Sequence, residues 1–224
     1  RMPTDLDPSH LSRDPAVAAR LRERGLESVL EPALRAGGLT RLESELAELD
    51  WNLLDRQRAT LQSSAELGEA EELQPPELLP ASARAQDPRV REAEARGWEE
   101  LRAGRVAVVT VAGGQASRLG FDGPKGAYPL GPVSGASLFQ ILAGGMQRLR
   151  ERAGAPVPWI LMTGPENDAA TRSYFAERSH FGLGARSIHF AEQGTLPALS
   201  PEGNLLLAAP DRLFRNPDGH GGLF

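Results

Sequence analysis

The stretch VAVVTVAGGQASRLGFDGPKGAY, from Val106 to Tyr128, indicates the fold of this chain more clearly than any other segment. It begins with a short apolar run that is rich in β-branched side chains, which is typical of a buried strand. Paired glycines follow at once, and a second glycine-rich turn carries Lys125, the only lysine among the 224 residues. A lysine is a compact point charge that suits a phosphate cradle, whereas an arginine is a planar fork. The stretch therefore predicts a strand that ends in an anion-binding loop.

Downstream of this loop, helical and extended patterns alternate. The expected order is a helix from Ser137, a strand at 158–162, a helix near 168–178, a strand at 187–190, and a hairpin at 196–207 that turns at 201–204. Strands that alternate with helices predict an α/β fold with a parallel sheet covered on both faces. Ligands of such sheets bind beyond the carboxyl ends of the strands. We therefore expect the loops after Val111, Met162 and Ala191 to share a crevice.

Upstream of the strand, the chain reads as helical. Asp14 and Pro15 suit the N-cap and first turn of a helix that Gly25 would end. A second short helix is expected to stop at Gly37 and Gly38. These patterns carry no recognisable chemistry, so they predict a region of packed helices.

The clearest helical pattern runs from Thr40 to about Leu61. Thr40 and Glu43 have the spacing of a capping box, and leucines at positions 42, 46, 49 and 53 lie on one face. Asp50 and Trp51 could be interpreted as a site. A core aromatic beside a solvated acid is the better interpretation.

A connector is expected between these helices and the strand. Periodicity lapses between residues 62 and 86, where prolines stand at positions 75, 76 and 80. Asp87 and Pro88 then begin a further helix, which Gly104 would end. We therefore predict a helical region at 1–103 and the α/β domain at 104–224. The turn NPDGHGG would normally lead into another element, so we expect the chain to be cut within a larger catalytic domain.

Composition narrows the possible classes of function. The formal net charge is −5, whereas a protein that binds nucleic acid nonspecifically needs a basic face. The absence of cysteine excludes disulfides, thiolate catalysis and cysteine-ligated metal. No apolar run approaches the length of a membrane span. The N-terminal segment RMPTDLDPSH lacks the apolar core of a signal peptide, so a cytoplasmic location is expected.

Three kinds of phosphate loop can be compared with residues 113–125. A dinucleotide-binding loop requires G-x-G-x-x-G and an acidic residue about 20 positions later. The glycine spacing differs here, and no Asp or Glu occurs between Asp122 and Glu151. A Walker loop requires Gly-Lys-Ser/Thr, whereas Lys125 stands between Pro124 and Gly126. A nucleotidyltransferase loop fits, and a glycine-rich turn that serves packing alone remains the structural alternative.

In a nucleotidyltransferase loop, Gly113 and Gly114 would let the backbone lie flat against a base or a phosphate. Successive backbone amides would form an anion nest. Ser117 can donate its hydroxyl, and Arg118 can donate two hydrogen bonds to phosphate oxygens. Attack on an α-phosphate builds charge on its nonbridging oxygens, which cations fixed in advance, such as Lys125, stabilise.

The runs VAGGQASRLG and GPKGAYPLG resemble the signature of the eukaryotic-type UDP-sugar pyrophosphorylases, most closely the UDP-N-acetylhexosamine pyrophosphorylase branch. Two later runs, FAEQGTLPALSPEGNLLL and PDGHGG, resemble the QQGxLPA and PDGNGG segments of that family. The resemblance implies a GT-A-like nucleotidyltransferase domain with a Rossmann-like mixed sheet. That domain would be incomplete at its C-terminus and would follow the helical N-terminal region.

The resemblance also implies roles for individual residues. Arg118 and Lys125 would be the catalytic cations that hold the phosphates, Gln193 would read uracil, and His220 would contact the sugar phosphate. The implied nucleotide-binding residues are Val111, Ala112, Gly113, Gly114, Ser117, Lys125, Gln193 and Gly219.

The implied activity joins UTP to N-acetylglucosamine 1-phosphate and releases UDP-N-acetylglucosamine and pyrophosphate, with help from Mg²⁺. The metal-binding aspartate and most sugar contacts would lie beyond Phe224, so no metal ligand is expected within this chain. The fragment alone is expected to be inactive. No membrane or nucleic-acid partner is expected.

Two departures from the family pattern leave alternatives open. His220 stands where the hexosamine branch has asparagine, and the glucose 1-phosphate branch has a histidine at this point, which favours glucose 1-phosphate as an alternative substrate. Ala116 replaces a glycine, and its methyl would restrict positive φ where the loop is tightest. Together with the missing C-terminal part, this leaves a non-catalytic nucleotide-binding module as a second alternative.

Polar residues outside these motifs are assigned structural roles. Glu166, Asn167 and Asp168 suit a helix cap better than a metal site. His180 and His189 are assigned to packing or to the surface.

Overall fold

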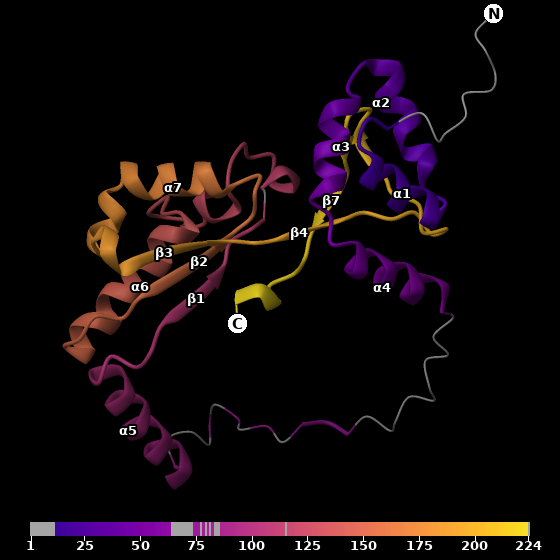
Figure 1. The fold of residues 1–224 in the computed structure, drawn as a ribbon. Helices are drawn as coiled ribbons and strands as arrows, with labels where there is room; N and C mark the ends of the chain where they lie inside the picture. The colour runs from indigo at the N-terminus through magenta and orange to yellow at the C-terminus, as the bar shows by residue number, and fades with distance from the viewer. Residues whose placement is uncertain are drawn as a thin grey trace, which may run out of the picture. The chain divides into compact units, whose positions relative to one another are not determined.

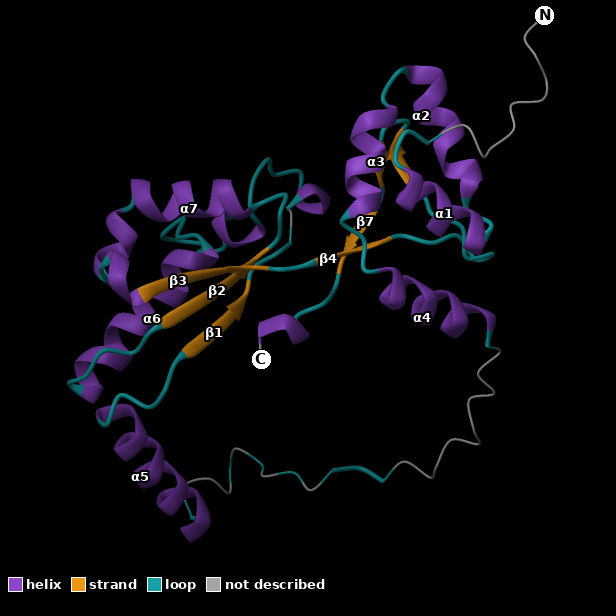
Figure 2. Ribbon diagram, in the orientation of Figure 1, coloured by secondary structure: helices purple, strands orange, loops and turns teal. Residues whose placement is uncertain are grey.

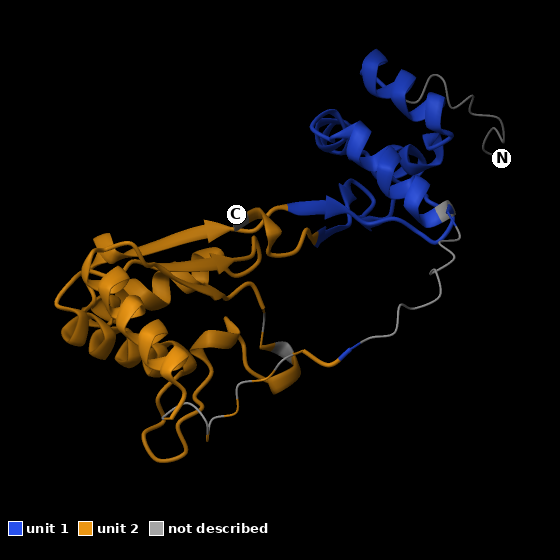
Figure 3. Cartoon of the chain, turned by 90° about the horizontal axis from the view of Figure 1, so that it is seen from below, with its two compact units in different colours: residues 1–74, 195–216 blue, residues 75–194, 217–224 orange. Residues whose placement is uncertain are grey.

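The computed structural model describes residues 12–63, 74–76, 78, 80, 82, 86–114 and 116–223 of the chain (Figure 1). They belong to two compact units, residues 1–74 with 195–216 and residues 75–194 with 217–224 (Figure 3). The N-terminal segment without a signal core and most of the predicted connector at 62–86 lie outside the described residues. Within the described ranges, no helix is both long enough and apolar enough to cross a bilayer.

The first unit contains four described α-helices: α1 (Pro15–Arg24), α2 (Leu30–Ala36), α3 (Leu39–Ala47) and α4 (Trp51–Gln62). The predicted ends of the first helix are confirmed. The Asp14 carboxylate accepts hydrogen bonds from the first backbone amides of α1, and Gly25 ends that helix with a left-handed φ of 63°. Gly37 ends α2 in the same way.

The capping box predicted for the third helix is wrong. Gly38 precedes α3, Thr40 lies inside the helix, and no side chain caps its start. The Glu43 carboxylate is buried and accepts hydrogen bonds from the Ser12 hydroxyl at 2.6 Å and from the Asp14 backbone amide at 3.3 Å. Glu43 therefore ties the start of the described chain to α3.

The single helix predicted up to residue 61 is two helices, α3 and α4. The Asp50 side chain accepts a hydrogen bond from the Leu53 backbone amide at 3.0 Å and so begins α4 as its N-cap. Asp50 itself is exposed, and Trp51 is buried in the core of the unit. The interpretation of this pair as a solvated acid beside a core aromatic is confirmed.

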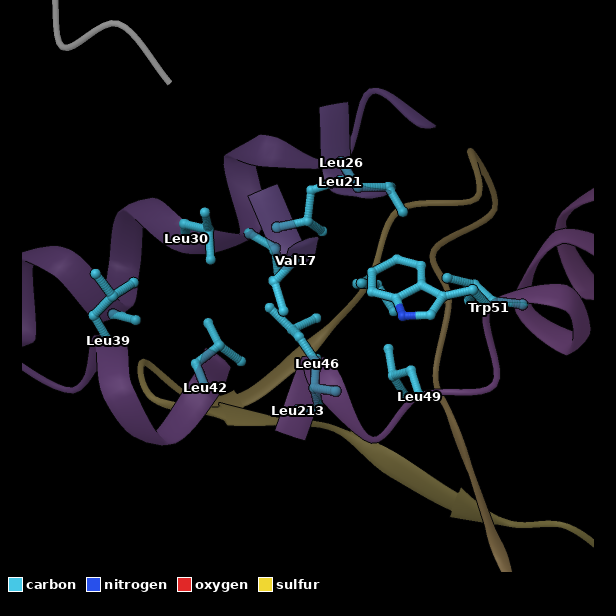
Figure 4. Packing of buried hydrophobic residues seen from close by; sticks show 14 residues of the cluster. Val17, Leu21, Leu26, Leu30, Leu39, Leu42, Leu46, Leu49, Trp51 and Leu213 are labelled. Atoms are coloured by element: carbon cyan, nitrogen blue, oxygen red, sulfur yellow. The ribbon is translucent and has the colours of Figure 1, made fainter. Parts of the chain in front are cut away.

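Leucines from α1, α2 and α3 form this core together with Trp51 (Figure 4). A later segment contains β4 (Thr195–Pro197), β5 (Leu207–Ala209), β6 (Arg212–Leu213) and β7 (Arg215–Pro217), and its leucines complete the core. β5 pairs with β6, and β4 pairs with β7. Leu205 and Leu213 enter the core, and the backbone amide of Leu213 donates to Glu45 Oε2 at 2.9 Å. The turn predicted at 201–204 is confirmed, since Ser200 donates its amide to the Asn204 carbonyl at 2.8 Å.

A parallel sheet of three described strands organises the second unit (Figure 2). Its order is β1 (Val108–Val111), β2 (Trp159–Thr163) and β3 (Ile188–Glu192). The helices of this unit are α5 (Pro88–Arg102), α6 (Leu138–Ala153) and α7 (Asp168–Glu177). The predicted α/β class and the predicted alternation of strands and helices are confirmed.

One face of this sheet packs on the core of the second unit, whereas the other face is largely open among the described residues, with Met162 buried there at 3% exposure. Trp159 and Leu161 point into a core that includes Phe139 of α6 and Phe175 of α7. The alternate positions of β1 are open, since Val109 is 43% exposed and Val111 is 59% exposed. The predictions of a buried first strand and of a sheet covered on both faces are therefore wrong for the described chain, because α6 and α7 both contribute to the same core.

The boundaries between the two units lie after residues 74, 194 and 216, whereas the predicted boundary lies between residues 103 and 104. α5 belongs to the second unit because Leu101 packs against its core, and because the Arg152 guanidinium of α6 lies 4.0 Å from the centre of the Trp98 ring. The segment at 195–216 belongs to the first unit through the leucines that it adds to the helical core.

A left-handed turn follows α7. Ser179, His180 and Phe181 have φ values of 49°, 52° and 53°, and they are the only described residues other than glycine with positive φ. Phe181 packs its ring against Phe175 with centroids 5.0 Å apart, and its carbonyl accepts a hydrogen bond from Gln147 Nε2 at 2.6 Å. These contacts hold a conformation that costs an L-residue roughly 1–2 kcal/mol.

Ser179→Gly is therefore expected to raise the free energy of unfolding by about 0.5–1 kcal/mol. Glycine removes the left-handed penalty, and its greater freedom in the unfolded chain offsets part of the gain. Ser173→Gly is the matched control, because Ser173 is an exposed serine inside α7 and the same change should destabilise the protein there. Urea unfolding of both variants tests the prediction, and equal signs for the two would contradict it.

Candidate functional site

The carboxyl ends of the three strands lie side by side. Val111 of β1 pairs in register with Met162 of β2, which pairs with Ala191 of β3. The pattern continues for one further residue, since Ala112 donates its amide to the Met162 carbonyl at 2.7 Å and Gln193 donates its amide to the Thr163 carbonyl at 2.8 Å. The loops after these strands therefore lie close together, and the crevice expected between them stays a prediction.

Gly113 and Gly164 meet back to back at this edge. A Cβ placed on Gly113 would lie 3.2 Å from Gln193 Oε1 and 3.4 Å from the Gly164 nitrogen. A Cβ on Gly164 would lie 3.2 Å from the Gly113 carbonyl oxygen. Close approach of the two loops, rather than positive φ, explains why glycine stands at both positions. Gly164 was not predicted as part of the site, although a glycine directly after the second strand was a signal for it.

Lys125 returns to the glycine loop, as expected from the second turn. It begins the 3-10 turn η4 (Lys125–Ala127), and its backbone amide donates to the Gly114 carbonyl at 3.1 Å. Its Nζ lies 3.4 Å from the position that a Cβ on Gly114 would occupy. The side chain is exposed. A positive charge therefore lies directly beside the loop, and its role toward phosphate remains a prediction.

Ala116 fits the loop without strain. Its side chain is buried with 1% exposure, its φ is not positive, and its amide donates to the Gly123 carbonyl at 3.2 Å. The methyl therefore fills space, and the expected restriction at this position is wrong. Arg118 follows in the 3-10 turn η3 (Ser117–Leu119) and is exposed, whereas the side chain of Ser117 lies outside the described part.

Gln193 links the glycine loop to the NPDGHGG segment. Its Nε2 donates to the Gly219 carbonyl at 2.5 Å, and its Oε1 faces Gly113. Gly219 has a φ of 89°, which favours glycine, and the exposed His220 follows it. The structure thus brings Gly113, Lys125, Gln193 and Gly219 into one neighbourhood of the second unit. Contact of Gln193 with uracil and of His220 with a sugar phosphate remain predictions.

The loop between β2 and α7 contributes Asn167, which the sequence analysis assigned only to a possible helix cap. Asn167 occupies the N-cap position of α7, yet its side chain makes no capping hydrogen bond. It is 1% exposed, and its amide group contacts Ala112, Gly114 and Gly164 instead. The signal for this residue was weak, since it consisted only of an amide shortly after a strand.

The Asp168 carboxylate makes its hydrogen bonds within the second unit. Its carboxylate accepts hydrogen bonds from the Thr163 hydroxyl at 2.5 Å and from Arg172 Nε at 2.6 Å. Burial raises the pKa of Asp168, but the hydrogen bonds from Arg172 and Thr163 outweigh burial, and the pKa lies below its ordinary value. Among the described residues, no group of three or more His, Asp or Glu side chains could hold a metal ion.

Asp168→Asn is expected to lower the free energy of unfolding at pH 7 by about 1–2 kcal/mol, because hydrogen bonds to a charged group are lost. A lowered pKa means that the carboxylate stabilises the fold above the ordinary pKa of 3.8, and that this contribution is lost as the pH falls through the lowered value. The difference from the wild type should therefore shrink between pH 5 and pH 3. Urea unfolding of both proteins across this pH range tests the predicted decrease, with Asp122→Asn at an exposed position as the control. A difference that stays constant with pH would contradict the assignment.

Comparison with known proteins gives consistent matches. The sequence model of the UTP-glucose-1-phosphate uridylyltransferase family matches residues 60–224. The UDP-N-acetylglucosamine pyrophosphorylase of Saccharomyces cerevisiae is 44% identical over 132 residues, which cover 57% of this chain and 28% of the relative. The UDP-N-acetylhexosamine pyrophosphorylase-like protein 1 of Mus musculus is 32% identical over 93% of this chain and 44% of its own length.

A solved structure agrees with these matches. The uridine diphosphate N-acetylglucosamine pyrophosphorylase of Trypanosoma brucei, crystallised with an inhibitor, has a TM-score of 0.71 and 28% identity over 99% of this chain and 45% of its own chain. The chain therefore spans less than half of the length of these three relatives. Since the family model covers the glycine loop, Lys125, Gln193 and the NPDGHGG segment in one continuous match, the chain belongs to the UTP-glucose-1-phosphate uridylyltransferase family.

Proposed function

We propose that this chain forms the nucleotide-binding part of a uridylyltransferase, which joins UTP to N-acetylglucosamine 1-phosphate and releases pyrophosphate. One observation carries the proposal. The glycine loop at Gly113 and Gly114, the only lysine, and Gln193 with Gly219 converge beyond the carboxyl edge of a parallel sheet. This is the edge at which α/β sheets bind nucleotides.

The loop suits a nucleotide because two sides of it are free of side-chain bulk. Gly113 packs closely against Gly164 and the Gln193 side chain, so a Cβ there would be crowded, and Gly114 is exposed. A base or phosphate can therefore approach the backbone directly. Lys125 lies beside Gly114 and supplies a positive charge where a phosphate would lie.

The proposed reaction is an in-line displacement at the α-phosphorus of UTP. An oxygen of the sugar phosphate forms a bond to this phosphorus, and the bond from the α-phosphorus to the bridging oxygen of the β-phosphate breaks, so that pyrophosphate leaves. Negative charge builds on the phosphate oxygens in the transition state, and Lys125 and Arg118 would stabilise it without reorganisation. Positioning of the two substrates would supply the rest of the acceleration.

The proposal includes Mg²⁺ as the cofactor of the whole protein, because the family resemblance implies it. The described residues offer no cluster of carboxylates that fits this ion. No step of the proposed reaction is assigned to Mg²⁺ held by the described residues.

The sugar preferred in the proposal is N-acetylglucosamine 1-phosphate, because the yeast and trypanosome relatives are named for UDP-N-acetylglucosamine. His220 supports glucose 1-phosphate as a second candidate. It is exposed directly after Gly219, so its imidazole is free of burial and can donate a hydrogen bond to a sugar hydroxyl. The fit of Ala116 removes one reason for a non-catalytic module.

Pyrophosphate release by the product of the complete gene, measured with UTP and a panel of sugar 1-phosphates, tests the proposal. We expect N-acetylglucosamine 1-phosphate to give the highest kcat/KM. The same reaction mixture without any sugar 1-phosphate serves as the blank. A preference for glucose 1-phosphate would support the second candidate. Binding of UTP without pyrophosphate release from any sugar phosphate would contradict the proposal and favour a nucleotide-binding module.

A further inference from the structure

Asn167 makes a set of contacts that a helix cap does not require. Its Oδ1 accepts a hydrogen bond from the Gly164 amide at 2.8 Å. Its Nδ2 donates to the Ala112 carbonyl at 2.8 Å and to the Gly114 carbonyl at 3.2 Å. The side chain therefore bridges the loop after β2 and the glycine loop after β1.

Burial makes these contacts costly to lose. Asn167 is 1% exposed, so water does not readily replace a missing partner. Both N–H groups of the amide have acceptors, and both acceptors are backbone carbonyls of the glycine loop. Glycine residues have little conformational restriction of their own, so the loop depends on such contacts for a fixed shape.

The Gly114 carbonyl connects Asn167 to Lys125. This oxygen accepts one hydrogen bond from Asn167 Nδ2 and another, at 3.1 Å, from the Lys125 backbone amide. The Ala112 carbonyl, in turn, is held toward Asn167, and a planar trans peptide then directs the Gly113 amide away from Asn167. The buried Asn167 side chain thus fixes the orientation of the Gly113 amide and the position of the Lys125 backbone.

We propose that Asn167 is a positioning residue, which holds the glycine loop and Lys125 in the arrangement that binds the triphosphate of the nucleotide. The proposal rests on the proposed function for the identity of the ligand. It assigns Asn167 no contact with the nucleotide, because its side chain is buried and its Oδ1 and Nδ2 already have partners within the protein.

Asn167→Asp gives the sharpest test because it preserves shape and the acceptor for Gly164 but removes both donors to the loop. Asn167→Ala is the second variant, in case the carboxylate prevents folding. Thr171→Val is the matched control, since Thr171 is fully buried on the same helix and its hydroxyl has no hydrogen-bond partner among the described residues. The control should leave the loop unchanged.

The first readout is amide hydrogen exchange of the 224-residue chain without ligand. We expect exchange of the Lys125 amide to become about tenfold faster in Asn167→Asp, with no change in α6 and no change in Thr171→Val. Unchanged exchange at Lys125 in both Asn167 variants would overturn the proposal. This readout does not depend on the identity of the nucleotide, so failure of the proposed function would not obscure it.

The second readout is the affinity for UTP in a double-mutant cycle with Lys125→Ala. We expect Asn167→Asp to weaken binding about tenfold in the wild-type background and less than about twofold when Lys125 is already absent. An undiminished tenfold loss in the Lys125→Ala background would overturn the proposed action through Lys125. Absence of UTP binding by the wild-type chain would contradict the proposed function and would leave hydrogen exchange to decide the positioning role.

Discussion

Lys125→Ala is expected to lower kcat/KM for UTP about 100- to 1000-fold in the product of the complete gene, by analogy with removal of one preorganised group that stabilises transition-state charge. The fold should survive, because the hydrogen bond to Gly114 comes from the backbone amide and alanine keeps it. The Nζ lies beside the exposed Gly114, and the chain has no second lysine to replace it. Stopped-flow or coupled measurement of pyrophosphate release gives the rate.

Arg186→Ala is the matched control for Lys125→Ala. Arg186 is exposed and precedes β3, so it lies at the amino end of that strand, opposite to the glycine loop. Its loss changes the net charge by the same amount and should leave the rate within about twofold. Lys125→Arg should restore part of the activity, since it keeps the charge but not the compact geometry. A rate within about twofold of the wild type for Lys125→Ala would contradict the electrostatic role.

Gly126→Ala is expected to lower the free energy of unfolding by about 1–3 kcal/mol, the cost of overpacking a core. A Cβ at this position would lie 2.2 Å from Phe139 Cζ. Phe139 is 1% exposed, and its ring packs against Phe175 with centroids 5.0 Å apart, so it has little room to move. The strain would also displace the neighbouring Lys125, so UTP affinity should fall together with stability.

Gly145→Ala is the control for Gly126→Ala. Gly145 lies inside α6, and a Cβ there would have no heavy atom within 4 Å. Alanine should therefore stabilise the protein by about 0.5–1 kcal/mol through its helix propensity. Urea unfolding of both variants measures the two effects. A stabilising or neutral Gly126→Ala would show that the Phe139 ring does not limit this position.

Local signals predicted much of the fold. Helix starts at Asp14, Asp87 and Ser137 follow the sequence, because a cap joins a side chain to amides only two or three residues away. The break before Trp51 was missed because the leucine stripe continues through it, although Asp50 carried the signal of a new N-cap. Local patterns compete at such a point, and burial of Trp51 decides between them.

Long-range packing was harder to predict. Brevity and β-branching predicted a buried strand at β1, yet Val111 is 59% exposed because no described helix covers that face. The assignment of the 195–216 segment to the helical unit was also missed, since it depends on where Leu213 finds a core. Which partner a half-apolar strand meets is not encoded in its own pattern.

The candidate site likewise combines residues that motifs predicted with a residue that only long-range contacts reveal. The family resemblance implied that the glycine loop, Lys125, Gln193 and Gly219 belong together, and the structure brings them to one edge of the sheet. Asn167 was missed because two of its hydrogen bonds reach residues more than fifty positions away in the sequence. A short-range helix cap explained an asparagine at this position equally well. Only the folded backbone distinguishes the two interpretations.

The central claim is that the loop beside Lys125 binds UTP, and calorimetric titration of the 224-residue chain with UTP, CTP, ATP and GTP tests it most directly. We predict that UTP binds most tightly and that Lys125→Ala weakens this binding at least tenfold, whereas Arg186→Ala leaves it unchanged. Equal affinity for all four nucleotides, or UTP binding that survives Lys125→Ala, would contradict the claim.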